Sequence, residues 1–111
     1  MTRTLHLRVM AEYGSSGIWG FSPRPAGGVF RHGMVEHAAL GLPPDLAAAF
    51  DAWIRRYEDE GPGGGLDVAD FNLQGLVLAA RLAEVLGPDR HVEFQGEAPE
   101  GGLAPPVVVR P

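Results

Sequence analysis

Cysteine and lysine are both absent from the 111 residues of this chain. Without cysteine the chain has no disulfide, no thiol nucleophile and no thiolate zinc ligand. Cysteine usage therefore gives no indication of whether the protein resides in an oxidising or a reducing compartment. Without lysine it has no Schiff-base residue, no lysine base and no phosphate-loop lysine. These two absences remove several classes of enzyme chemistry, and they leave arginine as the source of all nine basic side chains.

Long apolar runs are absent as well. Residues 1–20 contain no segment that resembles a secretory signal, and no stretch approaches the roughly 20 apolar residues of a membrane span. We therefore expect a soluble, cytoplasmic protein that does not contact a membrane. The length, 45% hydrophobic and 21% charged residues predict one globular domain over residues 1–111.

Glycine and proline are abundant, with 16 and 10 residues respectively, and they indicate that much of the chain is loop. We place the compact part at about residues 3–96. Residues 97–111 are interpreted as a Gly/Pro-rich tail that either adds an edge strand or is disordered.

Charge is unevenly distributed along the chain. Residues 1–31 carry a formal charge of +3 and residues 32–111 carry −8, which gives −5 overall. A net acidic chain is a poor generic binder of nucleic acid, so direct nucleic-acid binding is not expected.

The first regular element is an alternating segment over residues 5–11, in which Leu5, Leu7, Val9 and Ala11 share one face. This period of two predicts a half-buried strand. A turn follows at Gly14–Gly17, and a short apolar segment at Ile18–Phe21 is predicted to pair with the first strand. Residues 34–42 are read as a brief strand or an extended connection.

Two helices follow. Pro43 and Pro44 suit a helix start, and Leu46, Phe50, Trp53, Ile54 and Tyr57 form one apolar stripe. Asp67 is predicted to cap the second helix, which is apolar on most of its surface and should be the more buried of the two. Gly75 within it indicates close backbone packing. A last short strand is expected at His91–Gln95.

These elements predict an α+β fold: a two-layer sandwich with two amphipathic helices on one face of a small, mostly antiparallel sheet.

Residues 5–95 contain a set of short motifs that also occurs in other proteins. The motifs are MAEYG at a strand end, LP before a Trp-bearing helix, FN followed by Gly, and GPD before V-x-F. In these motifs the chain resembles a group of small uncharacterised bacterial proteins. The group has no established activity, so the resemblance assigns no catalytic residue. In size and character the chain is similar to immunity partners of bacterial toxins.

Two surfaces are predicted to bind a protein partner. The first is the loop from Tyr13 to Phe21, in which aromatic residues follow a deformable turn. The second is an acidic run at a helix C-terminus, where the macrodipole favours cations instead. Together with Asp67 and Asp70 this run places five acids and no base in thirteen residues. The predicted partner-binding residues are Tyr13, Ser15, Ser16, Trp19, Phe21, Glu58, Asp59 and Glu60.

The leading hypothesis is a non-enzymatic protein-binding module, an immunity or antitoxin-type inhibitor of a basic toxin or effector. The alternative is a small enzyme or an anion- or nucleotide-binding protein that uses the backbone amides of the GSSG turn. The residues of that alternative site are Ser15, Ser16, Arg24, Arg31 and His32. No catalytic residue, metal site or cofactor is predicted, and the oligomeric state is left open.

Overall fold

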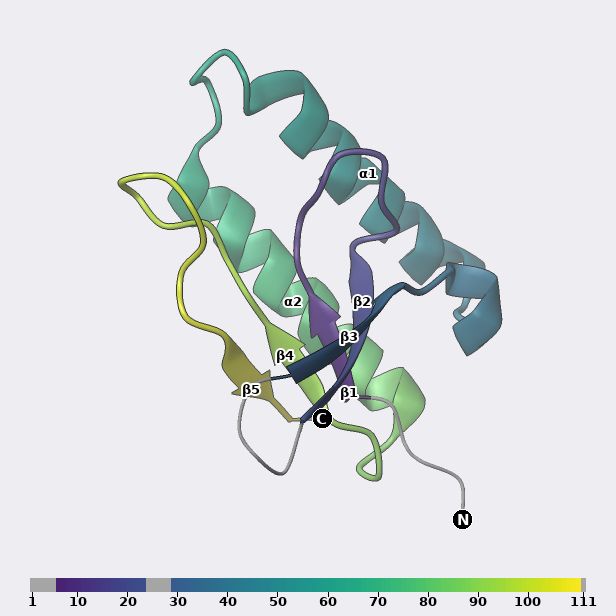
Figure 1. The fold of residues 1–111 in the computed structure, drawn as a ribbon. Coiled ribbons are helices and arrows are strands. Elements are labelled where there is room, and N and C mark those ends of the chain that lie inside the picture. The colour runs from purple at the N-terminus through teal and green to yellow at the C-terminus, as the bar shows by residue number, and fades with distance from the viewer. Residues whose placement is uncertain (1–5, 24–28, 111) are drawn as a thin grey trace.

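The computed structural model describes residues 6–23 and 29–110, with helices packed behind a five-stranded sheet (Figure 1). The strands are β1 (His6–Val9), β2 (Ile18–Pro23), β3 (Val29–Met34), β4 (Val92–Phe94) and β5 (Val107–Val109), and their order in the sheet is β3-β2-β1-β4-β5. The helices are α1 (Pro44–Glu60) and α2 (Val68–Leu86). The predicted α+β fold is confirmed.

The sheet is mixed, because one of its strand pairs is parallel. β1 pairs with β2 in antiparallel fashion and with β4 in parallel fashion, while β2·β3 and β4·β5 are antiparallel. The sheet is therefore mostly antiparallel, as predicted. The parallel pair is possible because α1 and α2 together form the long crossover that two parallel strands require.

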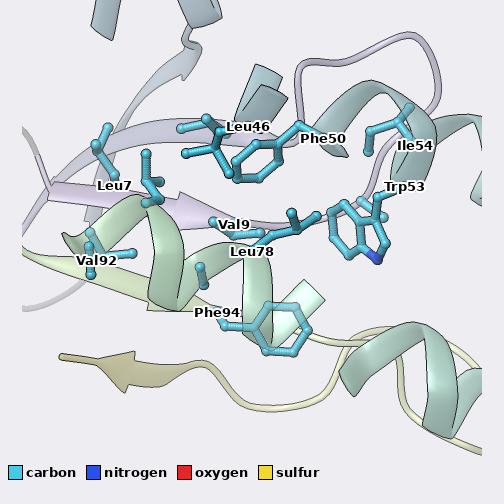
Figure 2. Close-up of a cluster of buried hydrophobic side chains, with 14 of the residues drawn as sticks. Leu7, Val9, Leu46, Phe50, Trp53, Ile54, Leu78, Val92 and Phe94 are labelled. Atoms are coloured by element: carbon cyan, nitrogen blue, oxygen red, sulfur yellow. The ribbon is translucent and has the colours of Figure 1, made fainter. Parts of the chain in front are cut away.

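The core lies between the sheet and the helices. Leu7 and Val9 of β1 are fully buried, and the intervening Arg8 faces the opposite side of the sheet. Residues of β1, β4 and both helices converge in this layer (Figure 2). The labelled members are Leu7, Val9, Leu46, Phe50, Trp53, Ile54, Leu78, Val92 and Phe94. The alternating pattern of the sequence therefore assigned the buried face of β1 correctly.

Both helices begin and pack as the local sequence indicates. The Asp67 side chain accepts a hydrogen bond of 3.1 Å from the Asp70 amide and so caps α2. A Cβ atom at Gly75 would overlap the rings of Trp53 and Phe94, which confirms that glycine permits close packing at this position. Trp53 is buried and stacks on Phe71 with ring centroids 4.7 Å apart.

Two local expectations need correction, and the structure decides the alternative for the tail in favour of an edge strand. Residues 34–42 contain a short 3-10 helix at His37–Leu40 rather than only extended chain. The tail is ordered over its described residues, because β5 adds to the sheet beside β4 and an isolated bridge joins Glu97 to Leu103. The compact part of the chain thus extends beyond residue 96.

The second helix has six buried residues and the first has four, as predicted, but one face of α2 is exposed. Leu73, Leu76, Val77 and Val85 are exposed large apolar residues of α2, and α1 has none among its described residues. The sheet and α1 cover only part of the circumference of α2, so a broad apolar surface does not imply complete burial. Among the described helices, none is long and apolar enough to cross a membrane.

Candidate functional site

Three connections meet at one end of the molecule. They are the loop after β1, the turn between α1 and α2, and the loop after β4 (Figure 1). The parallel pairing of β1 and β4 explains part of this arrangement, because the carboxyl ends of parallel strands lie at the same edge of a sheet. A hollow of about 380 Å³ lies here. Its lining includes Tyr13, Tyr57, Leu66, Val68, Glu97 and Pro99.

The structure joins the two surfaces that the sequence predicted separately. The Gly14 amide donates a 2.7 Å hydrogen bond to Oε2 of Glu58, at the C-terminal end of α1. The rings of Tyr13 and Tyr57 lie beside each other with centroids 5.1 Å apart. The tip of the GSSG loop is therefore fixed against the acidic helix end, and both belong to one surface.

The amides of the GSSG loop already have acceptors within the chain. Gly14 donates to Glu58, Ser15 donates to the carbonyl of Glu12 at 3.3 Å, and Gly17 donates to Oγ of Ser15 at 3.1 Å. The Ser16 amide lies 3.3 Å from Sδ of Met34. The predicted cradle for an external anion is thus not formed by these amides, because the Glu58 carboxylate and other internal acceptors use them.

The serine hydroxyls are likewise engaged inside the protein. Ser16 is buried, and its Oγ donates to the carbonyl of Val35 at 2.6 Å. Oγ of Ser15 donates to the carbonyl of Glu12 at 2.9 Å. Ser16 therefore shapes the loop from within, which corrects its prediction as a contact residue for a partner or anion.

The two aromatic residues after the loop lie on the sheet face that the helices leave uncovered. Phe21 is only 6% exposed and packs against His6, with ring centroids 5.3 Å apart. Trp19 is half-buried, and its indole N–H donates to the carbonyl of Met10 at 3.1 Å. Phe21 is therefore not an exposed anchor. Of the predicted aromatic contacts, Tyr13 is the exposed one, at 52%.

Several acids of the run have internal partners that offset the unfavourable helix dipole. Glu60 pairs with Arg56 at 3.3 Å, and Asp70 pairs with the same guanidinium at 2.8 Å. Asp67 caps α2, where a negative charge is favourable. Asp59 is exposed and joins none of the ion pairs found among the described residues.

Two further acids complete the surface. Glu12 follows β1 and Glu97 follows β4, and Glu97 lines the hollow together with Tyr57. Burial raises the pKa of Glu97 above its ordinary 4.5, and the nearby charge of Glu12 raises it further, against a smaller lowering by the Tyr57 hydrogen bond. Burial also raises the pKa of Tyr57, with additional contributions from Glu97 and Glu12.

We call the residues Glu12, Tyr13, Tyr57, Glu58, Asp59 and Glu97 the acidic edge. Sequence reasoning missed Tyr57 and Glu97 as surface residues, because Tyr57 continues a core stripe and Glu97 opens a segment interpreted as a tail. The available signal was the pairing of the strand at residues 92–94 with the first strand. That pairing brings Glu97 to the residues that follow the first strand.

A second polar cluster lies on the uncovered sheet face. Arg8 lies 3.5 Å from Glu93 and 3.3 Å from Oε1 of Gln95, and Nε2 of His91 lies 3.2 Å from Glu93. A pocket of about 280 Å³ beside this cluster is lined by Arg8, Met10, Glu12, Trp19, Gly20, Phe21, Gly33 and Leu103. The cluster joins β1 to β4, because Glu93 is nearly buried and forms an ion pair with Arg8 across the two strands.

The titration of His6 belongs to this face. Burial lowers its pKa from the ordinary 6.5, and the neighbouring His91 lowers it further, while Glu93 acts in the opposite direction. Because the unfolded chain binds the proton more tightly, His6 contributes stability above pH 6.5 that is lost as the pH falls toward its native pKa.

The remaining predicted residues of the anion site cannot be placed. Arg24 lies outside the described residues, as do the side chains of Arg31 and His32. The residues that are described contain no group of three or more His, Asp or Glu side chains able to hold a metal ion.

In comparisons with known proteins, no protein-family model and no curated protein matches this chain.

Proposed function

We propose that this protein is a non-enzymatic binding module that recognises a basic protein through the acidic edge. The observation that carries this proposal is the electrostatic imbalance at Glu97. Its pKa is raised first by partial burial of the carboxylate and second by the nearby charge of Glu12, so the charged form is destabilised. A guanidinium or ammonium group supplied by a partner would remove that cost.

The shape of the edge also supports recognition. Tyr13 presents an exposed ring at the rim of the hollow, and its contact with Tyr57 limits the conformational entropy that binding would otherwise remove. The Glu58 hydrogen bond to Gly14 holds the loop in place. Interfaces commonly use a fixed aromatic anchor surrounded by charges that steer the partner.

The class of partner follows from the charge of the edge. Four acids of the acidic edge, Glu12, Glu58, Asp59 and Glu97, form no ion pair among the described residues. An inhibitor of immunity or antitoxin type for a basic toxin, acting in the cytoplasm, fits this charge, the small size of the chain and the resemblance of its motifs. Electrostatic steering would make association fast and sensitive to salt.

The test compares two variants with the same change in net charge. Asp59→Arg reverses an exposed charge on the acidic edge, and Glu84→Arg reverses an exposed charge on α2. Proteins from the source cells that are retained by the immobilised wild-type chain at low salt are purified, and their affinity for each variant is measured by calorimetry. We expect Asp59→Arg to weaken binding about 10-fold or more and Glu84→Arg to change it little.

Tyr13→Ala provides a second arm, because it removes the aromatic anchor without changing the charge. It should also weaken binding about 10-fold, with a salt dependence equal to that of the wild type. Equal affinity of wild type, Asp59→Arg and Tyr13→Ala for the purified partner would refute the acidic edge as the binding surface.

A further inference from the structure

The outer surface of α2 carries large apolar side chains that neither the sheet nor α1 covers. Leu73 is 60% exposed and Val77 is 52% exposed, and the two residues lie one helical turn apart on the same face. Water-exposed residues of this size are ordinary when single, whereas a contiguous group on one helix face indicates an interaction surface.

The apolar pair borders a groove between the two helices. The groove has a volume of about 450 Å³, and α1 contributes the small residues Ala49 and Ala52 to its wall. Leu73 and Val77 of α2 form the opposite wall. The small alanines let another molecule approach this face closely, with Leu73 and Val77 as its apolar contacts.

Two ion pairs join the helices along this face, and they have opposite arrangements. Arg56 and Asp70 line the groove, whereas Asp45 and Arg81 lie about one helical turn beyond its lining residues. At one end α1 supplies the base and α2 the acid, through Arg56 and Asp70 at 2.8 Å. At the other end α1 supplies the acid and α2 the base, through Asp45 and Arg81 at 3.0 Å. The charges along α2 therefore change sign between the two ends of the apolar group.

This pattern is complementary to itself under a twofold rotation. If a second copy lies with its α2 antiparallel to the first, Asp70 of each molecule faces Arg81 of the other, and the Leu73 and Val77 side chains meet between them. On α1, Arg56 of each molecule then faces Asp45 of the other. Each intramolecular ion pair then lies beside an ion pair of the other copy, with acid facing base. The apolar side chains between the ion pairs are removed from water.

We propose that the α1–α2 face, formed by Asp45, Ala49, Ala52, Arg56, Asp70, Leu73, Val77 and Arg81, binds a second copy of this chain in that antiparallel arrangement. The charges favour a second copy over an unrelated partner. The acid of α2 at one end of the face, Asp70, is complementary to the base of α2 at the other end, Arg81, and Arg56 and Asp45 of α1 are complementary in the same way. This inference does not depend on the acidic edge being a binding site.

The first experiment measures the molar mass in solution by light scattering after size exclusion. The wild-type chain is loaded at concentrations from about 10 µM to about 1 mM, a range that detects weak homodimers. We expect a rise toward twice the monomer mass. Val77→Gln should shift the dissociation constant at least about 10-fold upward. A wild-type chain that stays monomeric at the highest concentration overturns the proposal.

Val108→Gln is the matched control. Val108 is 54% exposed, close to the value for Val77, but it lies on the strand β5 and faces the other side of the sheet. The control should dimerise like the wild type. If both variants weaken dimerisation equally, the α1–α2 face is not the interface.

The second experiment tests the antiparallel arrangement through charge reversal. Asp70→Arg alone and Arg81→Asp alone should each be monomeric, because either homodimer would place like charges opposite each other. In an equimolar mixture of the two variants every crossed pair again joins an acid to a base, so a heterodimer should form. Circular dichroism verifies that both variants are folded. Folded variants that fail to associate when mixed, beside a dimeric wild type, overturn this arrangement.

Discussion

At the scale of single residues, Gly75 shows how a local cost supports the core. Glycine within a helix is less favourable than alanine by about 1 kcal/mol. The rings of Trp53 and Phe94 nevertheless occupy the space that a Cβ atom would need. Glycine at this position of α2 lowers the helix propensity, but it allows α1, α2 and β4 to approach one another closely.

Gly75→Ala should therefore destabilise the protein although it favours the helix. We expect the free energy of unfolding to fall by about 1–2 kcal/mol, because the overpacking cost exceeds the gain in helix propensity. Urea unfolding followed by circular dichroism measures the change. Gly63→Ala is the control, since a Cβ at Gly63 meets no atom within 4 Å. A stabilised Gly75→Ala variant would contradict the packing account.

Asn72 connects α2 to the segment after β4. Its side chain donates to the carbonyl of Glu97 at 2.9 Å and accepts from the Glu97 amide at 2.9 Å. The side chain thus satisfies both backbone groups of one residue of the acidic edge. This role gives a physical reason for the asparagine in the FN motif of the sequence.

Asn72→Ala should make the segment after β4 less stable, because Asn72 no longer binds the backbone of Glu97. Two partly buried backbone groups lose their partners, so we expect a loss of about 1–3 kcal/mol in unfolding free energy. Hydrogen exchange of the amides in residues 97–103 should accelerate more than that of α1. Gln74→Ala serves as the control, because Gln74 is exposed and its side chain accepts a hydrogen bond from Arg56, not from the segment after β4. Unchanged exchange in residues 97–103 would disprove the clamp.

At the scale of the elements, β5 shows why the end of the chain is ordered. Its residues pair with β4, and Val109 lies opposite Val92, on the side that faces the helices. Val109 is half-buried against the core, whereas Val108 is exposed opposite Glu93. The strand is therefore held by its backbone hydrogen bonds and by one apolar face.

The two faces of β5 should respond differently to the same substitution. Val109→Ser removes apolar contacts with the core and should lower the unfolding free energy by about 1 kcal/mol. Val108→Ser should remain within about 0.5 kcal/mol of the wild type. Thermal or urea unfolding compares the two variants, and equal losses would mean that β5 does not pack on the core with the register observed.

At the scale of the whole molecule, the acidic edge brings together acids that are distant in the sequence and form no ion pair among the described residues. Glu12 comes from the loop after β1, Glu58 and Asp59 come from α1, and Glu97 comes from the loop after β4. Long-range packing brings them together although like charges repel. At Glu97, burial and then the nearby charge of Glu12 make the charged form costly in the native state, and a basic partner would relieve that cost.

The pH dependence of stability provides a measure of this cost. Glu97 has a native pKa above the ordinary 4.5, so its charge is more costly in the folded state at pH 7 than in the unfolded state. As the pH falls through the native pKa, that cost disappears. Glu97→Gln should consequently raise the unfolding free energy at pH 7 and leave it nearly unchanged at about pH 4.

Urea unfolding at the two pH values decides this prediction, and Glu100→Gln is the control. Glu100 is exposed, and its removal lowers the net negative charge by the same amount. The same stabilisation by both variants would show that net charge, rather than the position of Glu97, causes the effect.

The sequence by itself determined the elements whose signals are local. The alternation around Leu7 and Val9 fixed the buried face of β1, and the stripe from Leu46 to Ile54 fixed the orientation of α1. The cap at Asp67 and the close packing at Gly75 could also be predicted. Each of these features has a signal that is local in the sequence, so periodicity and residue type were sufficient to predict it.

Only the tertiary structure decided which distant segments meet. The parallel pairing of β1 with β4, the Glu58 hydrogen bond to Gly14 and the position of Glu97 join residues that no local pattern relates. The exposure of Leu73 and Val77 was decided in the same way, because apolar character indicates what a side chain can bury but not how much surface the rest of the chain can cover.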